Sequence, residues 1–167
     1  MAESLTRGPY LQSATPTSIV IFGRTDMATT STVAYVQKGA DVSAPRNIMT
    51  DLTAVLDHTL VISGLKPGTQ YQYAVISNGA DPKVTPFDIS HNFTTAPAVD
   101  TGPVRIWALG DCGTANANQK DVRDSFFAVN KGERTDVVLL LGDNAYSKGL
   151  DNEYQRAIFD IYASVPR

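Results

Sequence analysis

The spacing of hydrophobic positions changes near residue 100, and this change divides the chain into two parts. Before it, short apolar runs recur with turn residues between them, and no helical period lasts long enough to compete. The pattern predicts strands over residues 10–14, 18–24, 32–37, 58–63, 69–77 and 87–94. Short strands at this spacing are typical of a β-sandwich, so the first part is predicted to be all-β.

A tyrosine that follows a turn indicates which kind of sandwich to expect. The turn residues 65–68 lead to Tyr71 near the start of a predicted strand. A tyrosine so placed can hydrogen-bond upstream backbone through its hydroxyl, as in the tyrosine corner of immunoglobulin-like domains. The stretch resembles this corner in fibronectin type III domains, and we predict a sandwich of that type. His58 and His91 fall in or beside strands, where we expect packing or surface roles rather than ligand roles.

The second part of the chain shows the alternation of an α/β fold. A small, proline-flanked stretch at 97–103 is predicted to be a linker, which gives domains at 1–96 and 104–167. Apolar runs at 104–109 and 136–141 predict two strands. The second run is so continuously apolar that we expect it to be covered on both faces of a parallel sheet.

Two helices are predicted around the second strand. The first runs to about Asn130, can be capped by Asn116 or Asn118, and has an apolar face. That face is formed by Val122, Phe126 and Val129. The second covers about 151–163, and its packing stripe is Tyr154, Ile158, Ile161 and Tyr162. Two strands and two helices are too few for a stable core, so we expect this domain to be incomplete here. A longer form of the chain or another chain would complete it.

Both predicted strands end in Gly-Asp, and these two aspartates are candidate metal ligands. Asp111 and Asp143 are 32 positions apart, as in a strand, helix and parallel strand. Neighbouring parallel strands lie about 4.8 Å apart, so the two carboxylates can converge on one or two metal ions. Tyr146 can return beside Asp143, and a phenolate suits a hard ion such as iron(III). The alternative is that each aspartate caps a following helix, which a single turn would favour and two turns at this spacing disfavour.

These turns carry a family resemblance. The sequence GDCG at 110–113 and GDNAY at 142–146 resembles the first two motifs of calcineurin-like metallophosphoesterases, in the GDxG and GDxxY form of purple acid phosphatases. Residues 7–12 and 64–73 resemble the fibronectin-like N-terminal domain of the larger members. The resemblance implies a dinuclear metal centre of Fe(III) with Fe, Zn or Mn. In it Asp111 would bind iron(III), Asp143 would bridge the two ions, and Tyr146 would be the iron-bound tyrosinate.

The later motifs of that family, GNH and GHxH, are absent from these 167 residues. We therefore assign no catalytic residue within this chain, and we expect the chain alone to be inactive or nearly so. The expected function of the intact protein is hydrolysis of phosphate monoesters. The alternative is a non-catalytic sandwich that acts as a binding or spacing module. An SGNH-type esterase is disfavoured because 110–112 contains no serine, and Cys112 has no nearby histidine that would make it a nucleophile.

Composition and charge exclude some partners. A net charge of -3 gives no basic footprint for nucleic acid or membrane surfaces. No apolar run approaches the roughly 20 residues that span a bilayer. The expected partner is a phosphate monoester, and a homo-oligomer is compatible with the sequence. The family resemblance implies a secreted or periplasmic protein, although no signal peptide is visible in the N-terminal residues.

Overall fold

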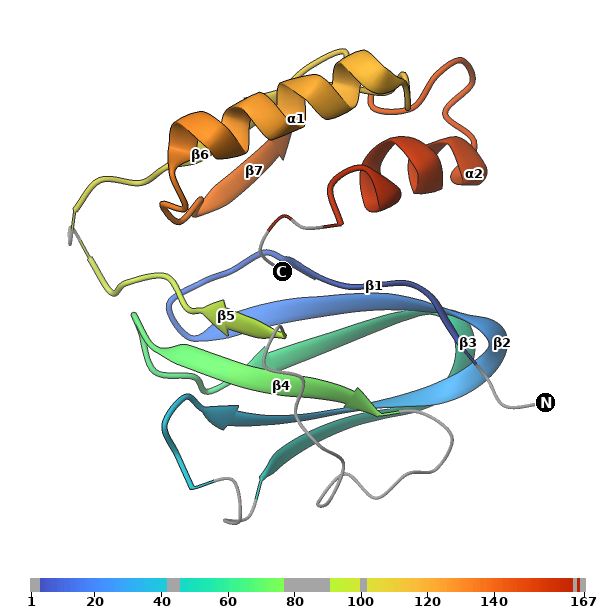
Figure 1. Cartoon of the computed structure of the whole chain (residues 1–167). Coiled ribbons are helices and arrows are strands. Elements are labelled where there is room, and N and C mark those ends of the chain that lie inside the picture. The colour runs from blue at the N-terminus through green and yellow to red at the C-terminus, as the bar shows by residue number, and fades with distance from the viewer. Residues whose placement is uncertain (1–3, 42–45, 77–90, 100–101, 164, 166–167) are drawn as a thin grey trace. The chain divides into compact units, whose positions relative to one another are not determined.

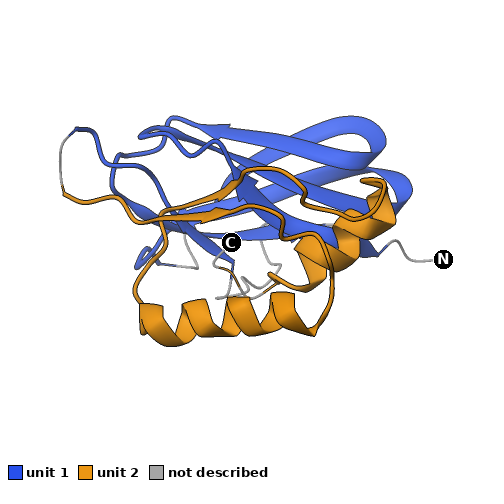
Figure 2. Cartoon of the chain, turned by 90° about the horizontal axis from the view of Figure 1, so that it is seen from above, with its two compact units in different colours: residues 1–101, 167 blue, residues 102–166 orange. Residues whose placement is uncertain are grey.

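The chain divides into two compact units, shown in Figure 2. The computed structural model describes residues 4–41, 46–76, 91–99, 102–163 and 165. The first unit is Met1–Thr101 with Arg167, and the second is Gly102–Pro166. The division falls inside the stretch 97–103 that the sequence marks as a linker. No helix among the described residues is long and apolar enough to cross a membrane.

Antiparallel strands make up the first unit (Figure 1). They are β1 (Leu5–Gln12), β2 (Ser18–Gln37), β3 (Asn47–Ser63), β4 (Gln70–Ile76) and β5 (Asn92–Thr94). Two predicted strands, 18–24 and 32–37, are parts of one long strand, β2, because the polar residues between them remain extended. The strand predicted at 58–63 likewise begins earlier, at Asn47. The first residues of the strand predicted at 87–94 lie outside the described part of the chain.

The pairing of β2 folds this sheet into a sandwich. β3 pairs along most of β2, whereas β1 pairs with its first half and β4 with its second half. The β2–β3 register shifts between Arg24 and Ser31, which is where both strands pass from one layer to the other (Figure 1). β5 pairs with β4 at the far side of its layer. The predicted β-sandwich is confirmed.

Alternate residues of both halves of β2 and of its partners fill the core. The core cluster consists of Ile19, Ile21, Val33, Leu60, Ile62, Leu65, Tyr71, Tyr73 and Phe93. Each such side chain contributes about 1.5–3 kcal/mol when it is removed from water. The Tyr71 hydroxyl accepts a hydrogen bond from the Lys66 amide at 3.0 Å, and its ring stacks on Phe93. The predicted tyrosine corner is therefore present, and it ties the turn before β4 to the core.

The second unit alternates strands and helices. Its elements are β6 (Ile106–Leu109), α1 (Ala117–Asn130), β7 (Val137–Leu140), α2 (Asp151–Tyr154) and a π-helical continuation, η1 (Gln155–Asp160). β6 and β7 are parallel neighbours, with Ile106 opposite Val137 and Leu109 opposite Leu140. The side chain of Asn116 caps α1 by accepting from the amide of Gln119 at 3.1 Å. Of the two capping residues considered, Asn116 is the one used.

The packed face of α1 matches the predicted one at Phe126 but not at Val122 or Val129. Val122 and Val129 are 58% and 80% exposed, and Gln119 is buried instead. Gln119 donates to the carbonyl of Ala157 at 2.7 Å, and Phe126 stacks on Trp107 with ring centroids 3.7 Å apart. The Ala157 carbonyl is available because the amide of residue 161 donates to Ile158. A helical wheel misses this, because the neighbour of α1 is an irregular helix whose free carbonyl requires a polar donor.

The expectation that the second strand is covered on both faces is wrong within the described residues. All four residues of β7 are exposed, by 37–43%. β7 has β6 on one side only, so it forms an edge of a two-stranded sheet. Ile106 on β6 is also 56% exposed, whereas Trp107 and Leu109 pack under α1. The apolar sequence of β7 therefore has less cover than a buried parallel strand needs.

Candidate metal centre

Two loops leave the same end of the β6–β7 pair and carry the predicted ligands. Backbone pairing continues past both strands: the Leu141 amide donates to Leu109 at 2.8 Å, and the Asp111 amide donates to Gly142 at 3.1 Å. Because parallel strands in register end together, the loops begin beside each other. This position, at the carboxyl ends of parallel strands, is where open α/β sheets bind ligands.

Both aspartates occupy a backbone conformation that most residues avoid. Asp111 and Asp143 each have φ of 53°, in the left-handed region. That region costs an ordinary L-residue about 1–2 kcal/mol, and aspartate is one of the few that enter it. Gly142 has φ of 130°, which favours glycine, so the second turn needs its glycine. Gly110 has no such φ, and the first turn is made by Asp111 itself.

Gly113 allows the two loops to touch. A Cβ atom added at Gly113 would lie 2.3 Å from the Ala145 nitrogen and 2.4 Å from the Asn144 carbonyl carbon. The Gly113 carbonyl accepts from the amide of Tyr146 at 2.9 Å. The close approach of backbone therefore explains this glycine. It also places Tyr146 opposite the first loop.

Tyr146 joins the two carboxylates. Its hydroxyl lies 2.9 Å from Oδ1 of Asp111 and 2.8 Å from Oδ2 of Asp143, and its single proton is shared between them. The hydrogen bond to Asp143 raises the pKa of Tyr146 well above its usual value, and burial and Asp111 add to this. The three predicted ligands, which come from two loops 32 residues apart in sequence, thus converge on one point.

Glu153, which the sequence interpretation missed, holds the loop behind Tyr146. Its carboxylate accepts from the amides of Ser147 at 2.8 Å, Lys148 at 3.1 Å and Leu150 at 2.9 Å. These amides, that of Leu150 above all, lower the pKa of Glu153. A glutamate three residues into a helix is the second half of a capping box, but Leu150 stands where the usual Ser or Thr would signal it.

Cys112 is packed rather than reactive. It is buried against Trp107 and Leu109, and its sulfur lies 3.7 Å from Oδ1 of Asn144. Burial raises the pKa of the Cys112 thiol, which keeps it protonated. This environment gives no support to a nucleophilic cysteine.

The donor set fits part of a hard-cation site. Two carboxylates and one phenol offer oxygen only, which suits hard ions, but such ions take about six ligands or more. No group of three or more His, Cys, Asp or Glu side chains capable of holding a metal occurs in the part of the chain that the structure describes. Both histidines belong to the first unit, and the sequence of residues 102–166 contains none. These three side chains alone therefore supply fewer ligands than such an ion takes.

Comparisons with known proteins concern the sandwich. No protein-family profile matches the chain, and no curated protein matches it either. A computationally redesigned β-sandwich protein is 20% identical, covering 57% of this chain and 94% of its own, with a TM-score of 0.40. The sensor domain of the anti-sigma factor RsgI4 of Pseudobacteroides cellulosolvens is 19% identical over 60% and 96%, with a TM-score of 0.41. The fn3 domain of the human collagen alpha-1(XX) chain is 16% identical over 62% and 91%, also at 0.41.

Proposed function

We propose that this chain supplies the first ligands of a purple acid phosphatase-like phosphomonoesterase. The observation that carries this proposal is the hydroxyl of Tyr146 within hydrogen-bond distance of both Asp111 and Asp143. Two loops on separate strands would have no need to converge in this way if each aspartate only capped a following helix. Asn116, rather than Asp111, caps α1, which also weighs against that alternative.

Each residue of the cluster has a distinct role in the proposal. Asp111 and Tyr146 would hold iron(III), and Asp143 would lie between it and a second ion, which is iron, zinc or manganese. Such a dinuclear centre supplies Lewis acidity toward phosphate oxygens and acidifies a bound water. The chain's own groups would offset the positive charge of the ions and hold the ligands in place. The two carboxylates bring negative charge to one point, and Glu153 fixes the loop behind Tyr146. All three predicted ligands are exposed, so a phosphate monoester can approach them.

The remaining ligands must come from outside the described residues. The exposed apolar strand β7 supports this part of the proposal, because an added strand would cover its free edge. A longer form of the chain or another chain would supply that strand, together with histidine ligands. A secreted or periplasmic location belongs to the same proposal. We expect the 167-residue chain alone to show little phosphatase activity.

A second candidate function is a non-catalytic binding or spacing module. The absence of histidine from residues 102–166 favours it, because the histidine motifs that the family resemblance calls for do not lie in these residues. The closed core of the sandwich also favours it, because that unit buries its own apolar side chains. Cation binding at the Asp111–Asp143–Tyr146 cluster distinguishes the two functions.

Terbium(III) tests the cluster directly, because it is a hard trivalent cation and a nearby phenol sensitises its luminescence. We expect saturable luminescence with the 167-residue chain, and its loss in Asp111→Ala and Asp143→Ala. Tyr146→Phe should weaken sensitisation, and Asp121→Asn, on the exposed surface of α1, is the matched control. Equal luminescence in wild type and the double Asp→Ala variant would remove the basis of the proposal.

Activity provides the second test, in any longer form of the chain that carries the histidine motifs. We expect hydrolysis of p-nitrophenyl phosphate that a chelator abolishes and that Asp143→Ala reduces to background. With iron(III), a visible charge-transfer band should be present in wild type and absent in Tyr146→Phe. A wild-type rate in Asp143→Ala would contradict the assignment of that residue.

A further inference from the structure

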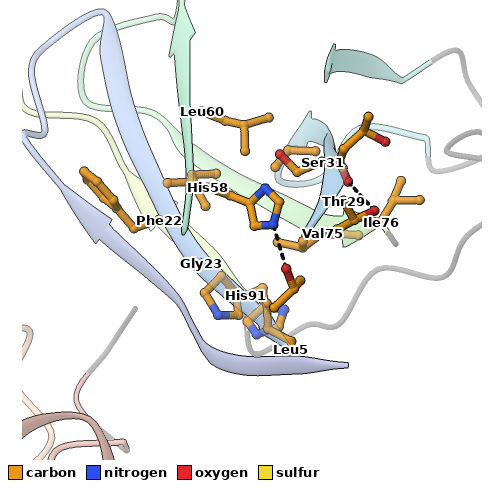
Figure 3. Close-up of a pocket in the computed structure, with 16 residues that line it drawn as sticks. Leu5, Phe22, Gly23, Thr29, Ser31, His58, Leu60, Val75, Ile76 and His91 are labelled. Atoms are coloured by element: carbon orange, nitrogen blue, oxygen red, sulfur yellow. Dashed lines mark hydrogen bonds between the residues drawn. The ribbon is translucent and has the colours of Figure 1, made fainter. Parts of the chain in front are cut away.

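A cavity of about 200 Å³ lies in the sandwich, where β2 and β3 bend between the layers (Figure 3). Strands β1, β2, β3 and β4 all contribute to its wall. Most of the lining is apolar, and includes Ile21, Val33, Leu60, Val75 and Ile76. An apolar cavity of about 150 Å³ holds one benzene molecule, so this one has room for a single substituted ring.

Two buried polar atoms on this wall have no hydrogen-bond partner among the residues that the structure describes. His58 is 4% exposed and Ser31 is 6% exposed, and both line the cavity (Figure 3). Within the described residues, Nδ1 of His58 and Oγ of Ser31 make no hydrogen bond. An unpaired polar atom in an apolar interior is costly, so these two positions call for an occupant with a polar group.

The other hydrogen bonds of His58 define what that polar group must be. The hydroxyl of Thr25 donates to the carbonyl of Met27 at 2.7 Å, which uses its only proton. The same oxygen lies 3.0 Å from Nε2 of His58 and therefore accepts from it. With the ring hydrogen on Nε2, the imidazole presents a lone pair at Nδ1. The cavity therefore offers a buried acceptor, and its occupant has to be a donor.

We propose that this cavity binds a small monocyclic aromatic alcohol of the phenol type. The ring occupies the apolar wall, and the hydroxyl donates to Nδ1 of His58. The hydroxyl of Ser31 provides a second polar contact to the same ligand. This site belongs to the first unit and is independent of the metal cluster on the second, so it extends the function of the sandwich beyond that of a spacer.

Phenol and toluene provide a matched pair of probes, because they have nearly the same size and only phenol carries a donor. We expect saturable chemical-shift changes when the 167-residue chain is titrated with phenol, centred on the amides of residues 31 and 58. Toluene should bind at least about tenfold more weakly, since it leaves the acceptor unpaired. The side-chain nitrogen signal of His58 should shift on addition of phenol and not of toluene.

Substitutions in the cavity wall test whether phenol binds at His58. His58→Leu should reduce phenol binding to the level of toluene, whereas Ser31→Ala should cause a smaller loss. Thr59→Ala, on the exposed side of the same strand, is the control and should bind like wild type. If His58→Leu does not fold, the nitrogen signal of wild-type His58 decides. Equal affinity for toluene and phenol, or no saturable change with either, would overturn the proposal and leave water as the occupant.

Discussion

The two units of this chain differ in how far their apolar strands are buried. In the sandwich, alternate positions of β2 and β3 place Ile19, Ile21 and Ile62 in the core at 2% exposure or less. In the second unit, the most apolar strand, β7, is exposed along its whole length. The difference shows that hydrophobic content does not ensure burial. A strand becomes buried only when partners exist on both of its edges and faces, and β7 lacks them among the described residues.

The contrast extends to backbone conformation. The loops beside β6 and β7 hold two aspartates in the left-handed region. Such conformations cost stability and persist where the surroundings impose them, often at functional sites. Among the described residues, the sandwich has one left-handed residue other than glycine, Ser13, whereas the second unit has four, and two of these are the aspartates of the cluster.

Truncating the sandwich core should have the largest effect on stability. Ile62→Ala removes a fully buried side chain and should lower the free energy of unfolding by about 2–5 kcal/mol. Val61→Ala, at the neighbouring position that is 50% exposed, is the matched control and should cost much less. Urea denaturation followed by circular dichroism measures both. Similar losses at the two positions would show that the sandwich core is not where the structure places it.

Separating the two loops should be the next largest effect. Gly113→Ala inserts a methyl group into the Asn144–Ala145 backbone and should cost about 1–3 kcal/mol. Gly110→Ala is the control, because its Cβ would lie 4.0 Å from its nearest neighbour. Trp107, the only tryptophan, reports unfolding of the second unit by fluorescence. If Gly110→Ala destabilised that unit as much as Gly113→Ala, the interlocked loops would not explain the glycine.

The tyrosine corner should contribute a smaller amount. Tyr71→Phe leaves the Lys66 amide without its partner and should cost about 0.5–1.5 kcal/mol. Tyr35→Phe, on β2 beside the same ring, provides a comparison that also removes one hydroxyl. Thermal and urea unfolding of both variants measure the difference. A Tyr71→Phe variant as stable as wild type would show that the tyrosine corner stabilises the sandwich through the packing of its ring and not through its hydrogen bond.

The smallest effect concerns the ionisation of the Tyr146 phenol in alkali and not the stability of the chain at neutral pH. The phenol of Tyr146 donates to two carboxylates, so its pKa is raised and it should remain protonated above pH of about 10. Because the pKa is raised in the folded state, the stability linked to this phenol is present below the ordinary tyrosine pKa of about 10 and is lost as the pH rises above it. The tyrosinate absorbance of wild type minus that of Tyr146→Phe isolates this group. Ionisation near the ordinary tyrosine pKa would contradict the shared hydrogen bond.

The site was predictable in part because its geometry follows from connectivity. A strand, helix and parallel strand bring Asp111 and Asp143 to one end of a sheet, and a turn brings Tyr146 back to them. The roles of Gly113 and Glu153 were not predictable from spacing. Gly113 is needed because backbone of the other loop approaches it closely. Glu153 accepts hydrogen bonds from amides whose positions depend on a turn that lacks the usual sequence signal.

By itself the sequence determined the division into a sandwich and an α/β unit, a helix start at Asn116 or Asn118, and the tyrosine corner at Tyr71. These features depend on period, turn residues and short separations, which are local properties of a chain. The tertiary structure alone decided that β2 is one strand, that Gln119 is buried instead of Val122, and that a cavity surrounds His58. In each case a distant segment supplies or withholds the partner, and no local spacing encodes which segment that is.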